Sequence, residues 1–375
     1  MADVEQGVID IMKACGIDIV LTLPCDKIKN LLAKVPEYFK EIPMTREENG
    51  MGIAAGLYLA GKKPAMLIQS TGIGNSINAL SSLHLTYHIP LPILASWRGV
   101  YKEGILAQEH FGGCLPCILE GSKLPYATVG SMNELSEIKR AIGLSFESNT
   151  PVVALLSPRV WEASTAKPYE PNIISQARSF DINCKTHVPK ATQTRYEMIK
   201  GMASYLKGKI VVSNIGVPSK ELYAACDQDS NFYMLGSLGL ATSIGTGLAM
   251  SVDTEVIVLD GDGSLLMNPN ALGSAAQEHP ENLTIVAFDN SANGSTGNQP
   301  TYSSHMDLEL LAKVYGIKNT AKVSTAAELL KVLKSSGKGP RFIHAVILAK
   351  NADVPNIPMT PEQIKERFMA DIRPL

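Results

Sequence analysis

Residues 256–264 read VIVLDGDGS and residues 283–290 read LTIVAFDN, and these two segments decide the fold. Each begins with a short apolar run, which is typical of a strand buried on both faces of a parallel sheet. Each run ends on acidic or amide side chains, and a helix-length segment lies between them. This order of strand, glycine turn, helix and strand places both polar ends at the carboxyl edge of one sheet, where open α/β folds bind ligands.

The polar ends of these strands have the chemistry of a phosphate and metal site. Gly261 and Gly263 let the backbone approach a phosphate closely, and Ser264 begins a helix whose N-terminus favours an anion. Asp262 and Asn290 offer the hard oxygen ligands that Mg²⁺ prefers. An ordinary Asp-Gly turn and an Asx turn also explain either segment taken alone.

Composition excludes several classes of function. The 375 residues carry 34 Lys and Arg against 36 Asp and Glu, a net charge of −2, so neither nucleic acid nor a membrane surface is favoured as a partner. The first residues, MADVEQGVID, have no basic apolar leader, and no apolar run reaches the ~18 residues of a membrane span. The scattered cysteines are typical of reduced thiols. These features predict a cytoplasmic protein.

The first half of the chain repeats the plan of the second. In the second half a helix rich in small residues, 241–250, precedes the strand, the glycine turn, a helix and the next strand. In the first half the small-residue segment 50–60 precedes a strand at 64–69, a Gly-rich turn at 70–75, a helix and a strand at 92–97. Both halves predict α/β domains with doubly wound parallel sheets.

A proline-containing polar stretch breaks the periodicity between the two halves. We therefore predict domains at 1–168 and 193–375, with 169–192 as the linker.

The order GDGS, 25 residues (264 to 288), then Asp289-Asn290 resembles the signature of thiamine diphosphate enzymes, GDG followed at a similar spacing by NN. Asp289 stands where the signature has its first Asn. In that family the metal is held by the Asp, the second Asn and a backbone carbonyl two residues later. The resemblance therefore implies thiamine diphosphate and Mg²⁺ as cofactors, with Asp262, Asn290 and the Ala292 carbonyl as metal ligands.

Decarboxylases of this family consist of a pyrimidine-binding domain and a diphosphate-binding domain of similar fold. The resemblance places the first on residues 1–168 and the second on 193–375. Larger members carry a third domain between them, for which this chain has no room.

The resemblance also implies the acid that activates the cofactor. In the family a Glu bonds the pyrimidine ring and stands nine residues before a Gly that closes a small-residue helix, and Glu47 and Gly56 have this spacing. Glu48 is the competing candidate. A helix start favours acidic residues through its dipole alone, so either Glu also fits a solvated first turn.

Gly236-Ser237-Leu238-Gly239 resembles the family's loop that bends the cofactor into a V shape. The resemblance implies that Leu238 is the wedge and that the Gly236 carbonyl accepts from the cofactor's amino group. Without the resemblance, the segment predicts only a Gly-rich turn before a helix.

Candidates for the substrate site are polar residues of both domains. His110, in QEHFGG, is placed where some relatives have an active-site His, and an imidazole near a carboxylate is chemically sensible. Arg and Lys bind anions, and the loop after the metal site offers polar side chains. These tentative substrate residues are Arg46, Arg98, Lys102, Asn293, Ser295 and Thr296.

Longer segments resemble the sulfopyruvate decarboxylases. REENGMGIAAGLYLAGKKPAMLIQSTGIGNSINALSSL resembles their α part, and FYMLGSLGLATSIGTGLAM with STGNQPTY resembles their β part, here fused in one chain. The implied reaction converts 3-sulfopyruvate to sulfoacetaldehyde and CO₂ in coenzyme M biosynthesis. The family also implies a homodimer at minimum, with a higher assembly plausible, whose sites lie between the first domain of one subunit and the second domain of another.

Three alternatives stay open at this point. A phosphonopyruvate decarboxylase shares most of these motifs, but it reads closer to STGGQPT where this chain has STGNQPT at 295–301. A compact decarboxylase that acts on an unsubstituted 2-oxo acid would need no residues to bind a second anionic group of the substrate. A non-catalytic, cofactor-binding regulatory subunit needs no Glu47.

Overall fold

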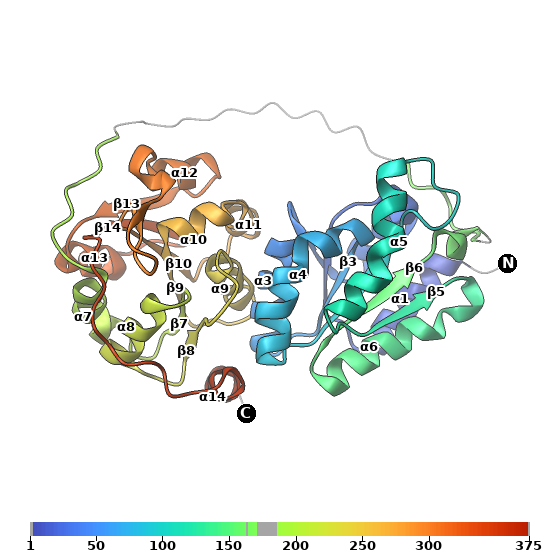
Figure 1. Ribbon diagram of the computed structural model, residues 1–375, viewed down its shortest axis with the longest axis horizontal. Coiled ribbons are helices and arrows are strands. Elements are labelled where there is room, and N and C mark those ends of the chain that lie inside the picture. The colour runs from blue at the N-terminus through green and yellow to red at the C-terminus, as the bar shows by residue number, and fades with distance from the viewer. Residues whose placement is uncertain (1–2, 163, 171–185, 374–375) are drawn as a thin grey trace. The chain divides into compact units, whose positions relative to one another are not determined.

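The computed structural model describes residues 3–162, 164–170 and 186–373 (Figure 1). The chain divides into two compact units, Met1–Tyr58 with Lys62–Ser179 and Leu59–Gly61 with Phe180–Leu375. Part of the predicted linker 169–192 lies outside the described residues, so the predicted domain boundaries stay predictions. None of the helices in the described ranges is long and apolar enough to cross a membrane.

The first unit is a six-stranded sheet of order β2-β1-β3-β4-β6-β5 in which every neighbouring pair is parallel. Successive strand residues point to opposite faces, so Val20, Leu67 and Leu94 share one apolar cluster with α1, α2 and α6. The strands are β1 (Ile19–Thr22), β2 (Lys40–Pro43), β3 (Pro64–Gln69), β4 (Leu91–Ser96), β5 (Tyr126–Val129) and β6 (Pro151–Leu156). The helices are α1 (Val4–Ala14), α2 (Lys29–Tyr38), α3 (Glu47–Leu59), α4 (Ile77–Ala79), α5 (Leu106–Gly121) and α6 (Ser136–Ser148).

The second unit is a six-stranded parallel sheet of order β13-β14-β10-β9-β7-β8. Its strands are β7 (Ile210–Ser213), β8 (Asn231–Tyr233), β9 (Val256–Gly261), β10 (Leu283–Asp289), β13 (Asn319–Val323) and β14 (Arg341–Val346), with a small hairpin of β11 (Ala292–Asn293) and β12 (Gln299–Pro300). Its helices are α7 (Arg195–Leu206), α8 (Val217–Cys226), α9 (Ala241–Ala249), α10 (Asp262–Met267), α11 (Asn270–Glu278), α12 (Leu308–Val314), α13 (Ala326–Lys334) and α14 (Pro361–Ile372).

The two units have the same topology. When the strands of each sheet are numbered along the chain, both sheets have the order 2-1-3-4-6-5. The fold class is therefore confirmed, as two α/β domains that repeat one doubly wound plan.

The helix expected after the GDG turn is two helices, α10 and α11. The break falls at Asn268-Pro269, because proline lacks an amide hydrogen and excludes the residue before it from the helical region. Asn268 accordingly has φ −139° and ψ 65°. Asp262 directly follows β9 and begins α10, so it lies at the edge of the sheet.

Small residues allow close contact between α9 and the sheet. A Cβ on Gly245 would lie 2.1 Å from Cγ2 of Val258 on β9. A Cβ this close requires the backbone or the valine to move, so the glycine sets the distance between α9 and β9.

Helix α5, which carries His110, lies directly on the loop that follows β4. A Cβ on Gly112 would lie 2.0 Å from the Arg98 carbonyl oxygen, and Trp97 donates its indole N–H to the Gly112 carbonyl at 3.0 Å. Gly99 has φ +85°, and a Cβ there would lie 2.1 Å from the Gln108 carbonyl oxygen. Two glycines therefore fix α5 against residues 97–99.

We expect Gly112→Ala to destabilise the first unit, because the added methyl group meets a backbone carbonyl that is unable to rotate away. Overpacking of this kind costs about 1–3 kcal/mol. The neighbouring Gly113→Ala is the matched control: nothing lies within 4 Å of its Cβ, and replacing a helical Gly by Ala stabilises by up to about 1 kcal/mol. Urea unfolding of both variants measures the difference, and equal midpoints would contradict this packing.

Candidate active site

A cavity of about 140 Å³ lies in the second unit, at the carboxyl edge of β9 and β10. Its lining comes from both strand ends, from the GSLG loop and from the β11–β12 hairpin. The structure thus brings together residues predicted separately for cofactor, metal and substrate: Leu238, Gly261, Asp262, Gly263, Ser264, Asn290, Ala292, Asn293 and Ser295.

Asp262 is a buried carboxylate at the start of α10, with 4% of its surface exposed. Its Oδ2 atom accepts from the hydroxyls of Thr301 and Ser303, the latter at 3.0 Å. Burial raises the pKa of Asp262, the hydroxyls lower it, and the negative charge of Asp289 raises it further; the net change is upward. No Lys, Arg or His pairs with Asp262 within the part of the chain that the structure describes. A bound cation would supply the missing positive charge.

Asn290 lies in a tight turn between β10 and β11. Ser291 has φ +52°, its amide donates to Asp289 at 2.9 Å, and the Ala292 amide donates to Asn290 Oδ1 at 3.2 Å. A carbonyl oxygen has two lone pairs, so Asn290 Oδ1 keeps one for a metal. No group of three His, Cys, Asp or Glu side chains suited to a metal occurs among the described residues. A metal here therefore needs amide, carbonyl and ligand oxygens besides Asp262.

Asp289, the departure from the signature, is buried with 3% exposed. Burial alone would raise the pKa of Asp289, but hydrogen bonds from His344 and Ser303 outweigh it, and the pKa lies below its usual range. Asp289 therefore carries negative charge close to Asp262, which strengthens the preference of this edge for a cation.

The glycines of the GDG turn face other polar side chains of the cavity. A Cβ on Gly261 would lie 3.3 Å from Asn214 Nδ2, and one on Gly263 would lie 3.2 Å from Asn293 Oδ1. Side chains at either position would fill the cavity beside Asp262. A buried uncompensated carboxylate next to backbone that lacks side chains fits a metal-bound diphosphate.

The GSLG loop turns sharply at the same cavity. Ser237 and Gly239 have φ +61° and +98°, and the Gly239 amide donates to Ser264 Oγ at 3.1 Å. Leu238 is half-buried and lines the cavity. The loop is thereby tied to the GDG turn, with its one bulky side chain directed at the proposed cofactor site.

Glu47 and Glu48 have different surroundings in the first turn of α3. Glu47 is 7% exposed, and its Oε2 accepts from Asn75 Nδ2 at 3.0 Å. A Cβ on Gly72 would lie 2.4 Å from Glu47 Oε1. Glu48 instead pairs with Arg46 at 3.1 Å. Only Glu47 is held against the Gly-rich segment 70–76, which forms a 3₁₀-helix rather than the expected turn.

Arg98 is already paired within the first unit. Its guanidinium bonds both oxygens of Glu103, at 2.6 and 2.8 Å, and Asp26 at 2.6 Å. Its side chain is 5% exposed and that of Glu103 is 4% exposed. Through these contacts Arg98 holds the loop 98–103 in place. Its predicted role in substrate binding gains no support from them and stays a prediction.

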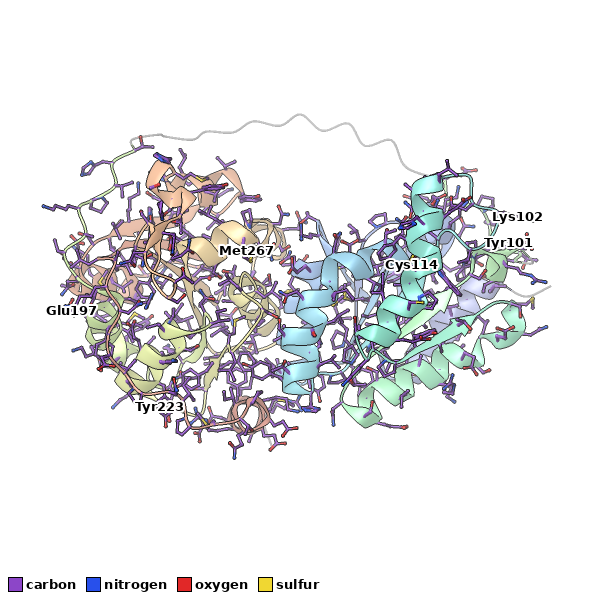
Figure 2. All side chains as sticks on the ribbon, viewed as in Figure 1. Tyr101, Lys102, Cys114, Glu197, Tyr223 and Met267 are labelled. Carbon is purple, nitrogen blue, oxygen red and sulfur yellow. The ribbon has the colours of Figure 1, made fainter. Side chains whose placement is uncertain are left out.

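The other anion and substrate candidates of the first unit lie at its surface. Lys102 and Tyr101 are neighbours there (Figure 2), and Lys102 pairs with Glu162 at 2.5 Å. His110 is exposed on α5. Arg46 has a 46% exposed side chain. These residues are accessible to a ligand, and their roles stay predictions.

Residues of the hairpin and several unpredicted residues complete the site. Thr296 bonds Gln299 Oε1 at 2.6 Å and is exposed, whereas Asn293 and Ser295 line the cavity. Sequence reasoning missed polar residues that bond the residues of the predicted motifs or line the same cavity: Asn75, Arg195, Asn214, Thr301, Ser303 and His344. Their only sequence signal is position, since Asn75 lies in the Gly-rich turn and Thr301 and Ser303 follow the metal loop.

Comparisons with known proteins show what the two halves of the chain are similar to. Two family models match, "Thiamine pyrophosphate enzyme, N-terminal TPP binding domain" at residues 2–115 and "Thiamine pyrophosphate enzyme, C-terminal TPP binding domain" at residues 219–345. The sulfopyruvate decarboxylase of Methanosarcina acetivorans is 51% identical over 374 residues, which cover 97% of this chain and 96% of that protein.

A separate subunit of such an enzyme matches about half of the chain. The sulfopyruvate decarboxylase subunit beta of Methanococcus maripaludis is 46% identical over 182 residues, covering 48% of this chain and 98% of the subunit. Among solved structures, benzoylformate decarboxylase from Polynucleobacter necessarius matches with a TM-score of 0.70 at 14% identity, covering 94% of this chain and all of that one (100%). At this identity the likeness concerns the fold alone.

The Arg98–Glu103 pair predicts a specific response to acid. The hydrogen bonds from Arg98, opposed by burial, lower the pKa of Glu103 from 4.5 to about 2. A group whose pKa is lowered on folding stabilises the fold above its unfolded pKa and loses that contribution as the pH falls through its folded pKa. Glu103 therefore supports stability at neutral pH and loses this effect between about pH 4.5 and about pH 2.

We expect Glu103→Gln to lower the free energy of unfolding at pH 7 and to flatten its decrease below pH 4.5, because a neutral amide does not titrate. Urea unfolding at a series of pH values measures both effects. Glu134→Gln, which changes an exposed carboxylate of the same unit, is the control. Parallel pH profiles for the parent protein and Glu103→Gln would show that the pair does not stabilise the fold.

Proposed function

We infer that this chain, which belongs to the sulfopyruvate decarboxylase family of thiamine pyrophosphate enzymes, decarboxylates 3-sulfopyruvate to sulfoacetaldehyde and CO₂. One arrangement carries the proposal: the GDG turn, the Asp289-Asn290 turn and the GSLG loop line a single cavity with a buried carboxylate. We further propose that the reaction takes place in the cytoplasm and serves coenzyme M biosynthesis.

We propose Mg²⁺ as the metal, held by the Asp262 carboxylate, the Asn290 amide oxygen and the Ala292 carbonyl. Hard oxygen ligands of this kind suit Mg²⁺, which usually completes its shell with phosphate oxygens and water. Gly261, Gly263 and Ser264 would bind the diphosphate through backbone amides and a hydroxyl. The cation would offset the negative charges of Asp262 and Asp289.

Thiamine diphosphate, when bound, supplies the carbon nucleophile and the electron sink for loss of CO₂ from a 2-oxo acid. Glu47 would hold a proton at its carboxyl group against the pyrimidine ring, and Asn75 orients that carboxyl group. Leu238 would set the shape of the cofactor, and Gly236 would accept a hydrogen bond through its carbonyl oxygen. The half-buried Leu238 lines the cavity and would exclude water from that side.

The second anionic group of the substrate requires a cation or another hydrogen-bond donor that is accessible to it. Arg46, Lys102 and His110 meet this condition, whereas the Arg98 guanidinium is engaged by Glu103 and Asp26. Asn293 and Ser295 line the cavity and would contact the substrate from the hairpin, with Thr296 bracing the hairpin through Gln299. We propose a homodimer as the minimum active unit.

The initial rate of CO₂ release from sulfopyruvate, phosphonopyruvate and pyruvate tests the proposed function. We expect sulfopyruvate to be preferred, and activity to need both thiamine diphosphate and Mg²⁺. Preference for phosphonopyruvate would leave the proposed cofactor site unchanged but would contradict the proposed substrate. No turnover of any of the three would favour a cofactor-binding subunit without catalysis.

We expect Glu47→Gln to lower kcat about 10²- to 10⁴-fold, the range of a general acid–base contribution, because the amide is unable to transfer a proton. The stability of the fold should change little, since Gln keeps the hydrogen bond with Asn75. Glu48→Gln is the matched control and should retain activity. A fully active Glu47→Gln variant would exclude this role for Glu47.

Gly72→Ala tests the placement of Glu47 without changing its chemistry. The added Cβ would lie 2.4 Å from Oε1 and 2.5 Å from Cγ of Glu47, so the carboxyl group must move. A displacement of about 1 Å costs about 10²-fold in rate. Gly104→Ala, which meets nothing within 4 Å, controls for a general effect of the substitution. Unchanged kcat in a folded Gly72→Ala variant would contradict the proposed geometry.

A further inference from the structure

Asp289 is a buried anion that the metal site does not use directly. Ser303 Oγ donates to its Oδ1 at 2.7 Å, and the amide and hydroxyl of Ser291 donate to the same oxygen at 2.9 and 3.1 Å. His344 Nε2 lies 2.8 Å from its other oxygen. Because an ionised carboxylate only accepts hydrogen bonds, this contact requires the histidine tautomer that carries its hydrogen on Nε2.

His344 comes from the strand next to β10. It lies on β14 opposite Ala287 in the parallel register, is fully buried, and reaches the end of β10 through its ring. It faces a second carboxylate on its other side: Nδ1 is 3.7 Å from Asp307 Oδ1, too far for a hydrogen bond. Asp307 caps α12 and pairs with Lys322 at 2.5 Å.

Asp289 is linked to the proposed metal ligands in two ways. Ser303 Oγ lies 2.7 Å from Asp289 Oδ1 and 3.0 Å from Asp262 Oδ2, so one hydroxyl bridges the two carboxylates. The Ser291 amide, bonded to Asp289, forms the turn that presents Asn290 and Ala292. The Asp289 carboxylate therefore contacts both the hydroxyl that donates to Asp262 and the amide of the turn.

A buried charge must be paired to be tolerated, and His344 is the one cationic or imidazole side chain that pairs with Asp289 among the described residues. The serine donors and the backbone amide are neutral. Without the imidazole, the carboxylate would lose its strongest partner and rotate or draw in water. Its hold on Ser303 and Ser291 would then be lost.

We propose that His344 is a positioning residue for the metal and diphosphate site: it fixes Asp289, which in turn fixes Asp262 through Ser303 and the 289–292 turn through Ser291. This inference rests on the proposed function, since it assumes that Asp262 and Asn290 bind Mg²⁺. The pairing with His344 explains how Asp289 is accommodated at a position where the signature has Asn.

The shape of the side chain at position 344 gives a matched pair of variants. In His344→Gln the amide nitrogen stands where Nε2 stands in histidine and is able to donate to Asp289. In His344→Asn the amide is shorter and does not reach Asp289. Both replacements are polar and smaller than histidine, so both keep the strand free of overpacking.

Magnesium-dependent binding of thiamine diphosphate, measured by titration calorimetry on the full chain, is the readout. We expect His344→Asn to weaken Mg²⁺ binding by about 10-fold, the lower end of the effect of losing a partner of a metal ligand, because His344 acts through Asp289. We expect His344→Gln to bind nearly as the parent does. Melting temperatures without metal or cofactor, measured in parallel, detect a purely structural role.

Asp289→Asn tests whether His344 acts through Asp289. The amide that this substitution introduces would donate to Nε2 of the other histidine tautomer, so the variant keeps the pair without a buried charge. In that background we expect His344→Asn to cost far less Mg²⁺ affinity than it does in the parent. An equal cost in both backgrounds would overturn the proposed route through Asp289.

Three results distinguish this inference from the proposed function and from a purely structural role. Parent protein that binds no thiamine diphosphate with Mg²⁺ would overturn the proposed function itself. Parent protein that binds both, with His344→Asn and His344→Gln of equal Mg²⁺ affinity, would overturn only the positioning role. A lower melting temperature of His344→Asn with unchanged Mg²⁺ affinity would likewise assign His344 to structure alone.

Discussion

Two buried carboxylates lie at the ends of neighbouring parallel strands in the second unit, and the polar residues around them are arranged to satisfy both. Asp262 follows β9 and Asp289 ends β10, and both are almost fully removed from water. Like charges in such surroundings repel each other and are poorly solvated. The surrounding residues offset this cost: Thr301 and Ser303 donate to Asp262, while Ser303, Ser291 and His344 donate to Asp289. The remaining unbalanced charge is what a divalent cation would bind.

Much of this could be predicted from the sequence, because the strands are apolar runs and the turns contain glycine. The strands at β9, β10 and β3 were expected nearly at their observed bounds, and the repeated order of elements predicted two units of one topology. The site residues Asp262, Asn290 and Leu238 could be located because each is part of a short motif of fixed spacing. Such motifs are read along the chain, and the structure places them around one cavity.

The residues that were missed interact across the fold rather than along the chain. His344 lies 55 residues from Asp289 in sequence and pairs with it only because β14 and β10 are neighbours. In the sequence it is a lone histidine in an apolar strand, which is more often a structural residue. The helix after the GDG turn was expected to be continuous, but Pro269 divides it, which shows that a local breaker outweighs an apolar pattern. Arg98 was chosen by residue type, and type alone does not reveal that Glu103 and Asp26 already occupy its guanidinium.

The shared topology makes the contrast between the units informative. The loop after β4 and the turn after β10 hold equivalent places in the two sheets, since each follows the fourth strand in the order 2-1-3-4-6-5. In the first unit this place is filled by Arg98, whose charge is balanced by Glu103 and Asp26 from the same unit. In the second unit it is filled by Asp289 and Asn290, next to the buried carboxylate of Asp262. The same backbone plan therefore gives one edge whose carboxylates pair with a guanidinium and one whose buried Asp262 has only hydroxyls as side-chain partners among the described residues. A metal-bound diphosphate would suit the second edge.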